Sequence, residues 1–333
     1  MVLLIRHAAA LILALTTALQ AAEPSPHAID IPPWFANSFL DVREEMRDAA
    51  ADGRRVMLYF GQDGCPYCKR LMEANFSQRD IVEATRKRFV AIALNLWGDR
   101  ETHWVDGVAR TEKELGVFLR VQFTPTLLFL DESGGVALRL NGYQPPERFR
   151  LAIDYAGRAR PGAESFADFL RASPQGAPRV AAPPAGLLRE PPVAVTFPRK
   201  AAQLLVFESR DCTACEELHA ALAHPELRAA VATLEPVRID AFGTRSVRHA
   251  AGEALTEAEL ARRLGVHFTP TLVYFDAEGR EVFRAEGYLR RFHLAATLDY
   301  VVQGAYRTEP SFQRFLQARA DRERAAGRPV DLW

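Results

Sequence analysis

The chain has 333 residues, of which 48% are hydrophobic and 25% are charged, a composition typical of globular domains. Lysine plus arginine and aspartate plus glutamate number 42 each, so the net charge is zero and no general attraction to nucleic acid or acidic lipid is expected. Collagen-like, coiled-coil and low-complexity classes are excluded, and four cysteines are too few for a disulfide-stapled miniprotein.

The first 22 residues form a predicted secretory signal peptide. Arg6 and His7 precede an uncharged run that ends at Leu19, and small residues follow it. The uninterrupted apolar run is shorter than the ~20 residues that a membrane span needs, which favours a cleaved signal over an anchor. We therefore expect a periplasmic protein with no stable membrane insertion after cleavage, in a compartment where disulfides can form.

The chain then alternates strand and helix signals, and a capping box, Thr111-x-x-Glu114, marks one helix start. The predicted elements are, in chain order, a helix at 39–49, a strand at 55–60, helical spacing after residue 65, a strand at 89–96, a helix at 111–119, a hairpin of strands 127–130 and 136–140, and a helix at 146–155. This order predicts an α/β fold in which helices flank a mixed β-sheet.

The second half of the chain repeats the first. Leu58-Tyr59-Phe60 before one Cys-x-x-Cys recurs as Leu205-Val206-Phe207 before another. Gln-Phe-Thr-Pro-Thr-Leu at 122–127 recurs as His-Phe-Thr-Pro-Thr-Leu at 267–272. The leading cysteine precedes the proline by 60 residues in the first copy and by 58 in the second. We therefore predict two homologous domains in tandem.

The repeat also sets the expected domain borders. The first domain is predicted at 30–172 and the second at 199–320. Between them, 173–198 is rich in proline and alanine and predicts a semi-rigid linker. The last residues, 321–333, are expected to form a C-terminal tail.

Each Cys-x-x-Cys lies where a predicted strand leads into a predicted helix. The leading thiol then stands at the helix N-terminus, where unpaired N–H groups and the helix dipole favour the thiolate. The thiolate is the nucleophile in disulfide exchange, and a second cysteine three residues later can resolve the mixed disulfide. Cys65 and Cys212 are therefore the candidate nucleophiles, with Cys68 and Cys215 as the candidate resolving thiols.

A zinc site and a structural disulfide are the alternative roles for these cysteines. A four-cysteine zinc site is disfavoured because 143 residues lie between Cys68 and Cys212. A disulfide between cysteines so close in sequence closes a very short loop and stabilises the fold little. We expect neither a metal nor a cofactor.

The two repeats resemble the thioredoxin superfamily over nearly all of their length. In that family a cis-proline faces the Cys-x-x-Cys, and Pro125 and Pro270 match it. The resemblance implies that the backbone of Thr124 or Thr269 is offered to an extended substrate. Cys-Pro-Tyr-Cys-Lys-Arg-Leu-Met and Gly-Tyr-Gln-Pro-Pro at 142–146 also resemble periplasmic thioredoxins associated with bacterial sulfur-oxidation systems.

The sequence departs from the family pattern next to each redox pair. Gly64 and Asp211 precede the leading cysteines, where ordinary thioredoxins have a tryptophan. Tyr59 and Val206 stand where the family has a buried acid that relays protons. The resemblance therefore leaves proton transfer unassigned, with Asp63 as a weak candidate.

A polar segment with Trp97, His103 and Trp104 lies between a predicted strand and the next helix. It is either a flap that contacts the substrate or a packed loop. We favour the packed loop, because loops of this length are only sometimes functional.

Two functions from different classes remain open. The first is a thiol–disulfide oxidoreductase that acts on exported proteins or sulfur carriers and is re-reduced by a membrane electron donor. The second is a non-catalytic binding module whose cysteines rest as static disulfides. Two intact pairs favour the enzyme, whereas reductase, oxidase and isomerase differ in reduction potential and redox partner, which the sequence leaves open.

Overall fold

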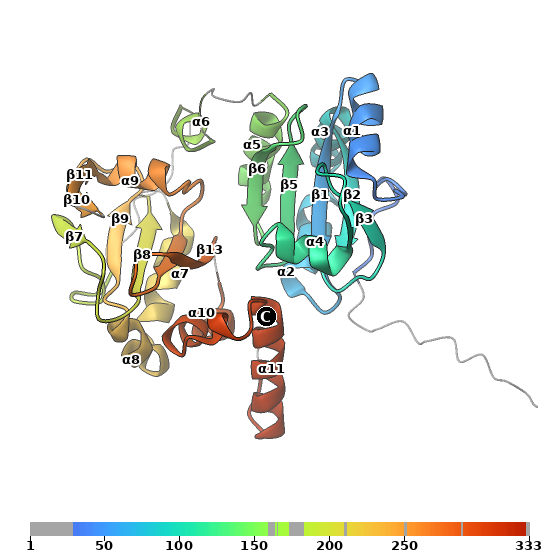
Figure 1. Cartoon of the computed structure of the whole chain (residues 1–333). Coiled ribbons are helices and arrows are strands. Elements are labelled where there is room, and N and C mark those ends of the chain that lie inside the picture. The colour runs from blue at the N-terminus through green and yellow to red at the C-terminus, as the bar shows by residue number, and fades with distance from the viewer. Residues whose placement is uncertain are drawn as a thin grey trace, which may run out of the picture.

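The computed structural model describes residues 29–158, 164, 166–172, 183–209, 212–249, 252–287 and 289–330. The predicted signal peptide at 1–22 lies outside the described residues. Figure 1 shows two α/β domains side by side, the first in blue and green and the second in yellow to red. The predicted fold class, two tandem domains that each place helices around a mixed sheet, is confirmed.

The first domain is built on a four-stranded sheet of order β2-β1-β5-β6. β1 and β2 are parallel, whereas β5 is antiparallel to both β1 and β6. The strands are β1 (Arg55–Gly61), β2 (Phe89–Asn95), β5 (Thr126–Leu130) and β6 (Val136–Asn141), with a separate hairpin of β3 (Glu101–His103) and β4 (Ala109–Thr111). The helices are α1 (Val42–Ala51), α2 (Pro66–Arg70), the π-helical η1 (Leu71–Asn75), α3 (Arg79–Arg88), α4 (Glu112–Phe118), α5 (Pro146–Ala156) and α6 (Phe166–Ala172).

The central strand β1 is buried at every residue after Arg55, so both faces of the sheet are covered. Met57 and Tyr59 face a core that includes α3 and α5, whereas Leu58 and Phe60 face a second core that includes α1 and α4. The alternation of side chains along a strand explains this division. The capping box predicted from the sequence is formed at the start of α4.

The second domain repeats this topology with the sheet order β9-β8-β12-β13. Its strands are β8 (Gln203–Glu208), β9 (Val237–Asp240), β12 (Thr271–Phe275) and β13 (Glu281–Glu286), beside a small sheet of β7 (Val193–Val195), β10 (Ser246–His249) and β11 (Glu253–Thr256). Its helices are α7 (Thr213–Leu222), α8 (Pro225–Thr233), α9 (Glu257–Arg263), α10 (Arg291–Val302), the short η2 (Ala305–Arg307) and α11 (Phe312–Ala325).

Two predicted borders differ from the structure. Part of the expected linker at 173–198 belongs to the second domain, because it contains β7, which pairs with β10, and Glu190, which forms ion pairs with two arginines of that domain. A strand of three residues among prolines gave no periodic signal. The expected tail at 321–333 is helical as far as Ala325, because its first residues are good helix formers.

Each domain inserts a phenylalanine into the core of the other. Phe123 packs among Phe283 and Phe312 of the second domain, with ring centroids 5.3 and 5.2 Å away. Phe268 packs against Phe166 of the first domain, at 5.1 Å between centroids. Phe123 and Phe268 both stand directly before Thr-Pro in their repeat, so the exchange is reciprocal.

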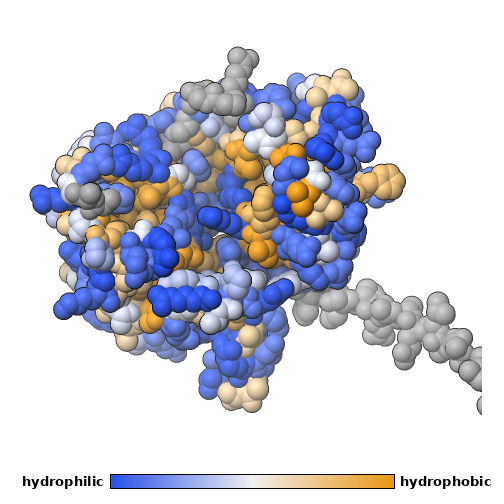
Figure 2. Space-filling model, in the orientation of Figure 1, coloured by the Kyte–Doolittle hydropathy of each residue, from blue (hydrophilic) through white to orange (hydrophobic). Residues whose placement is uncertain are grey.

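Polar contacts between the two domains surround the inserted Phe123 and Phe268. The edge strands β6 and β13 meet where the Asn141 amide donates to the Glu286 carboxylate at 3.0 Å. The side chain of Gln122 accepts from the backbone N–H of Phe312 at 3.1 Å, and its carbonyl accepts from Gln313 at 3.0 Å. The face seen in Figure 2 is mostly hydrophilic, and apolar residues gather on the first domain beside its border with the second.

The reciprocal insertion predicts that a substitution in one domain weakens the other. Phe123→Ala should lower the free energy of unfolding by about 3–5 kcal/mol, because it leaves a cavity in the core of the second domain. Hydrogen exchange should show lost protection in β12 and β13 of the second domain. Phe129→Ala, a buried residue that packs within the first domain, is the matched control and should loosen the first domain. If Phe123→Ala reduced protection in the first domain alone, Phe123 would not stabilise the core of the second domain.

Candidate functional site

The first cysteine pair lies where β1 leads into α2. Gly64, with a φ of 72°, turns the chain, and this positive φ favours glycine where ordinary thioredoxins have a tryptophan. Cys65 is the N-cap of α2, its Sγ accepts from the backbone N–H of Cys68 at 3.1 Å, and Pro66 follows at the first helical position. Cys65 and Cys68 form a disulfide whose Cα atoms are 5.2 Å apart. The predicted position of the leading sulfur at a helix start is therefore present.

The Thr-Pro loop of the first domain lies against this pair. The Sγ of Cys65 is 3.3 Å from the carbonyl oxygen of Thr124 and 3.3 Å from its hydroxyl, which donates to the sulfur. The Thr124–Pro125 bond is cis, and the Pro125 carbonyl accepts from the N–H of Gly142 at 2.7 Å. Three of the residues predicted for this site, Cys65, Cys68 and Thr124, therefore lie together in the structure.

The second pair has the same position at a helix start, but the Cys212 side chain makes no capping hydrogen bond with the described residues. Cys212 is the N-cap of α7 and is disulfide-bonded to Cys215, with Cα atoms 5.3 Å apart. The Thr269–Pro270 bond is also cis, and Ser209, at the end of β8, is hydrogen-bonded through its hydroxyl to that of Thr269 at 2.8 Å. The adjacent residues 210 and 211, including Asp211, lie outside the described part of the chain.

The second domain forms one wall of the cavity at Cys65. The cavity has a volume of about 430 Å³, and Cys65 itself is 4% exposed. The wall from α10, α11 and the loop before α10 is formed by Leu289, His293, Gln313, Leu316, Ala320 and Arg324. The backbone N–H of Arg290 donates to the Tyr67 hydroxyl at 3.2 Å, and the Tyr67 ring meets His293 edge-on at 5.3 Å. Sequence reasoning missed this wall because no local pattern marks a contact between distant segments.

Trp97 lies in this cavity, which the packed-loop interpretation did not anticipate. Its indole Nε1 donates to Gln62 at 2.5 Å, and Gln62 in turn donates to Gln313 of α11 at 2.9 Å. Trp104 in the same segment is buried in the core, as a packed loop predicts. The segment is therefore packed at Trp104, whereas the exposed Trp97 lines the same cavity as Cys65.

Tyr59 occupies the position of the family's buried acid in the first domain. Its hydroxyl is buried and forms no hydrogen bond with any residue that the structure describes. Burial, together with the nearby charge of Asp63, raises the pKa of Tyr59. The phenol therefore stays protonated at neutral pH and cannot accept a proton there. Asp63 lies at the mouth of the cavity, where its carboxylate accepts from the N–H of Ile29.

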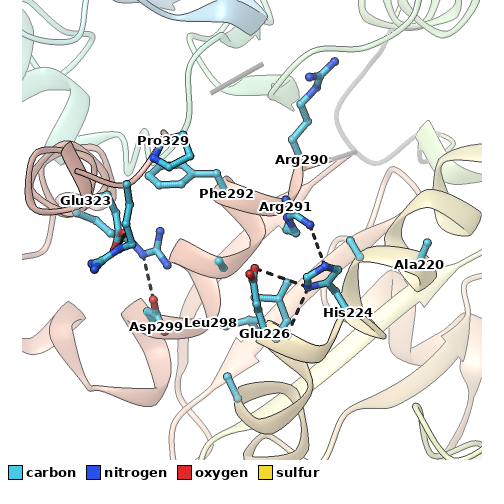
Figure 3. Close-up of a pocket in the computed structure, with 16 residues that line it drawn as sticks. Ala220, His224, Glu226, Arg290, Arg291, Phe292, Leu298, Asp299, Glu323 and Pro329 are labelled. Atoms are coloured by element: carbon cyan, nitrogen blue, oxygen red, sulfur yellow. Dashed lines mark hydrogen bonds and ion pairs between the residues drawn. The ribbon is translucent and has the colours of Figure 1, made fainter. Parts of the chain in front are cut away.

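A second cavity, of about 800 Å³, lies in the second domain between α8, α10 and α11. Figure 3 shows contacts between several of its lining residues, among them Arg291 with His224 and Asp299 with an arginine, which is Arg319 at 3.0 Å. Neither cysteine pair lines this cavity.

The described residues contain no group of three or more His, Cys, Asp or Glu side chains suited to a metal ion. Each helix in this part of the chain is also too short or too polar to span a membrane.

A Cys-x-x-Cys at a strand-to-helix junction beside a Thr-cis-Pro loop, present twice, defines a tandem protein with two dithiol–disulfide centres. The family model described as a thioredoxin-like domain matches residues 42–157 and again 196–302. These two regions make up more than half of the chain, and the chain therefore belongs to the thioredoxin-like family.

Three solved structures from bacteria are similar to parts of this chain. A thioredoxin-fold protein from Helicobacter pylori is 23% identical, covering 38% of this chain and 84% of its own, with a TM-score of 0.35. A thioredoxin from Thermus thermophilus is 26% identical over 34% of this chain and 82% of its own, with a TM-score of 0.27. The oxidised C-terminal domain of DsbD from Neisseria meningitidis is 18% identical over 35% of this chain and 92% of its own, with a TM-score of 0.26. A search of curated proteins found no match.

The wall formed by α11 predicts that large substrates reach Cys65 less easily than small ones. Replacing Gln313 and Leu316 by alanine should raise the rate of insulin reduction severalfold, because it opens the approach to Thr124, and should leave the rate with a small aromatic disulfide unchanged. Arg322→Ala, an exposed position on the same helix, is the control. Equal changes with both substrates would show that the wall does not select by size.

Proposed function

We propose that the chain is a thiol–disulfide oxidoreductase with two redox-active pairs. The observation that carries the proposal is the position of Cys65: it caps a helix, is bonded to Cys68 and lies 3.3 Å from the carbonyl of Thr124. A helix N-terminus favours the thiolate, and a carbonyl beside the sulfur offers a hydrogen-bond acceptor to an extended substrate chain.

The exchange proceeds in two steps at each pair. The thiolate of Cys65 attacks one substrate sulfur, a Cys65–substrate disulfide forms, and the other substrate sulfur leaves as a thiolate that takes up a proton. Cys68 then loses its proton and attacks the Cys65 sulfur, which forms the Cys65–Cys68 disulfide and releases the second substrate thiolate. The substrate gains two electrons and the protein loses two, so a donor must reduce the pair before the next cycle.

The compartment and substrates follow from the sequence rather than from the fold. The predicted signal peptide supports a periplasmic location, and the resemblance to thioredoxins associated with sulfur oxidation supports exported proteins or sulfur-carrier proteins as substrates. A membrane protein is a natural electron donor in a compartment without a cytoplasmic thiol pool. The direction of exchange depends on the reduction potential of each pair against its partner, so disulfide isomerase activity is the alternative within this class.

The oxidoreductase should accelerate reduction of insulin by dithiothreitol. The double variant Cys65→Ser plus Cys212→Ser should fall to the rate of dithiothreitol alone, because neither serine can form a mixed disulfide. The two single variants assign the activity to each domain. A wild-type protein no faster than dithiothreitol would favour a binding module with static disulfides.

The roles within a pair predict which variant traps its substrates. Cys68→Ser should accumulate mixed disulfides with partner proteins, since Cys65 attacks but nothing releases it. Cys215→Ser should do the same through Cys212. Non-reducing electrophoresis followed by mass spectrometry measures these adducts, with Cys65→Ser and Cys212→Ser as matched controls. Adducts on the controls instead would reverse the assignment of nucleophile and resolving thiol.

A further inference from the structure

The two repeats place different ionisable groups beneath their redox pairs. Glu208 is the last residue of β8 and corresponds to Gly61 of β1. His219 follows its resolving cysteine by four residues on α7, where Met72 stands in the first repeat. The second domain therefore has a carboxylate and an imidazole at two positions that are uncharged in the first.

Glu208 and His219 form a buried pair. Their side chains are 1% and 5% exposed, and the carboxylate oxygen Oε1 lies 2.5 Å from the imidazole Nε2. The other carboxylate oxygen accepts from the Arg238 guanidinium at 2.7 Å. Arg238 reaches from β9 and also pairs with Glu190, which pairs in turn with Arg245. Both carboxylate oxygens of Glu208 thus have a nitrogen partner, His219 on one side and Arg238 on the other.

Helix periodicity places His219 on the side of α7 that carries Cys215. Residues four apart share one face of a helix, and helical side chains lean towards the N-terminus, so His219 extends towards the turn that holds Cys215. Cys215 is fully buried. Glu208 ends the strand whose following loop leads to Cys212, four residues later. The acids Glu216 and Glu217 of α7 are exposed and stand on its solvent side.

The first domain fills the corresponding space with a group that cannot accept a proton. A Cβ atom at Gly61 would lie 2.1 Å from the Tyr59 hydroxyl, so this phenol occupies the place from which the Glu208 side chain extends in the second domain. Tyr59 remains protonated at neutral pH for the reasons given above. The two repeats thus differ in the chemistry available beneath the sulfurs.

We infer that Glu208 positions His219 to take the proton of Cys215 during release of substrate from the second site, an inference that rests on the proposed disulfide exchange. The Glu208 carboxylate accepts the hydrogen bond of His219 at Nε2, which makes Nδ1 the basic nitrogen of this imidazole. Cys215 loses its proton to this imidazole and attacks Cys212. The Cys212–Cys215 disulfide forms, and the substrate thiolate leaves with the electron pair. The imidazolium then returns its proton to the leaving thiolate or to water.

The step can be isolated in the full chain by removing the first pair with Cys65→Ser and Cys68→Ser. The reduced protein is mixed with an aromatic disulfide whose thiol products absorb visible light. The first release of chromophore reports attack by Cys212, and the second reports resolution by Cys215. His219→Met, which introduces the residue of the first repeat, should slow the second release about tenfold or more at neutral pH and leave the first unchanged. Glu208→Gln, which keeps the side-chain shape, should also slow only the second release and provides the test if His219→Met does not fold.

The pH profile separates a proton acceptor from a packing residue. In the wild type the second release should begin to rise at a lower pH than in His219→Met, where it depends only on ionisation of the thiol itself, near pH ~8.5. The matched control is Tyr59→Phe in the chain that retains only the first pair, where both releases should be unchanged. An unchanged second release in both His219→Met and Glu208→Gln, equal slowing of both releases, or slowing in the control would overturn the inference. The reporter is a chemical disulfide, so this result is independent of whether insulin is reduced.

Discussion

The structure depends on the mutual burial of Phe123 and Phe268. Each phenylalanine precedes a strand of its own domain, and its ring packs in the core of the other domain. Burial of a phenylalanine contributes about 1.5–3 kcal/mol, a sizeable share of the net stability of one domain. Because both residues directly precede a Thr-cis-Pro loop, the contact that joins the domains also fixes the loops that lie beside the cysteines. Phe123 and Phe268 therefore hold the two domains together and also position the loops of the redox sites.

The same contact explains why α11 lies over the first redox pair. Phe312, which receives Phe123, is the first residue of α11, so the helix starts at the domain border and continues along the cavity that holds Cys65. The glutamines around it, Gln122 and Gln313, satisfy backbone groups that this approach takes away from water. The wall of the cavity is therefore a product of core packing.

Much of this architecture could be predicted from the sequence because its signals are local. The repeated strand patterns, the capping box at Thr111 and the place of Cys65 at a helix start all depend on neighbouring residues, and all are present in the structure. The wall from α11 and the pairing of Glu208 with His219 join segments that are distant along the chain or lie on different elements, and no spacing rule reports such contacts. β7 was missed for another reason: a strand of three residues is too short to show alternation.

The reciprocal contact has the form of an isologous interface, in which the same surface patch serves on both partners. In a dimer of identical chains, any substitution at one redox site would appear at the other as well. Here the two copies are parts of one polypeptide, so their association is intramolecular and does not depend on protein concentration. The two copies can therefore differ in sequence. The first has the Tyr59 phenol near its redox pair and the second has the Glu208 carboxylate and the His219 imidazole, while one interface joins both.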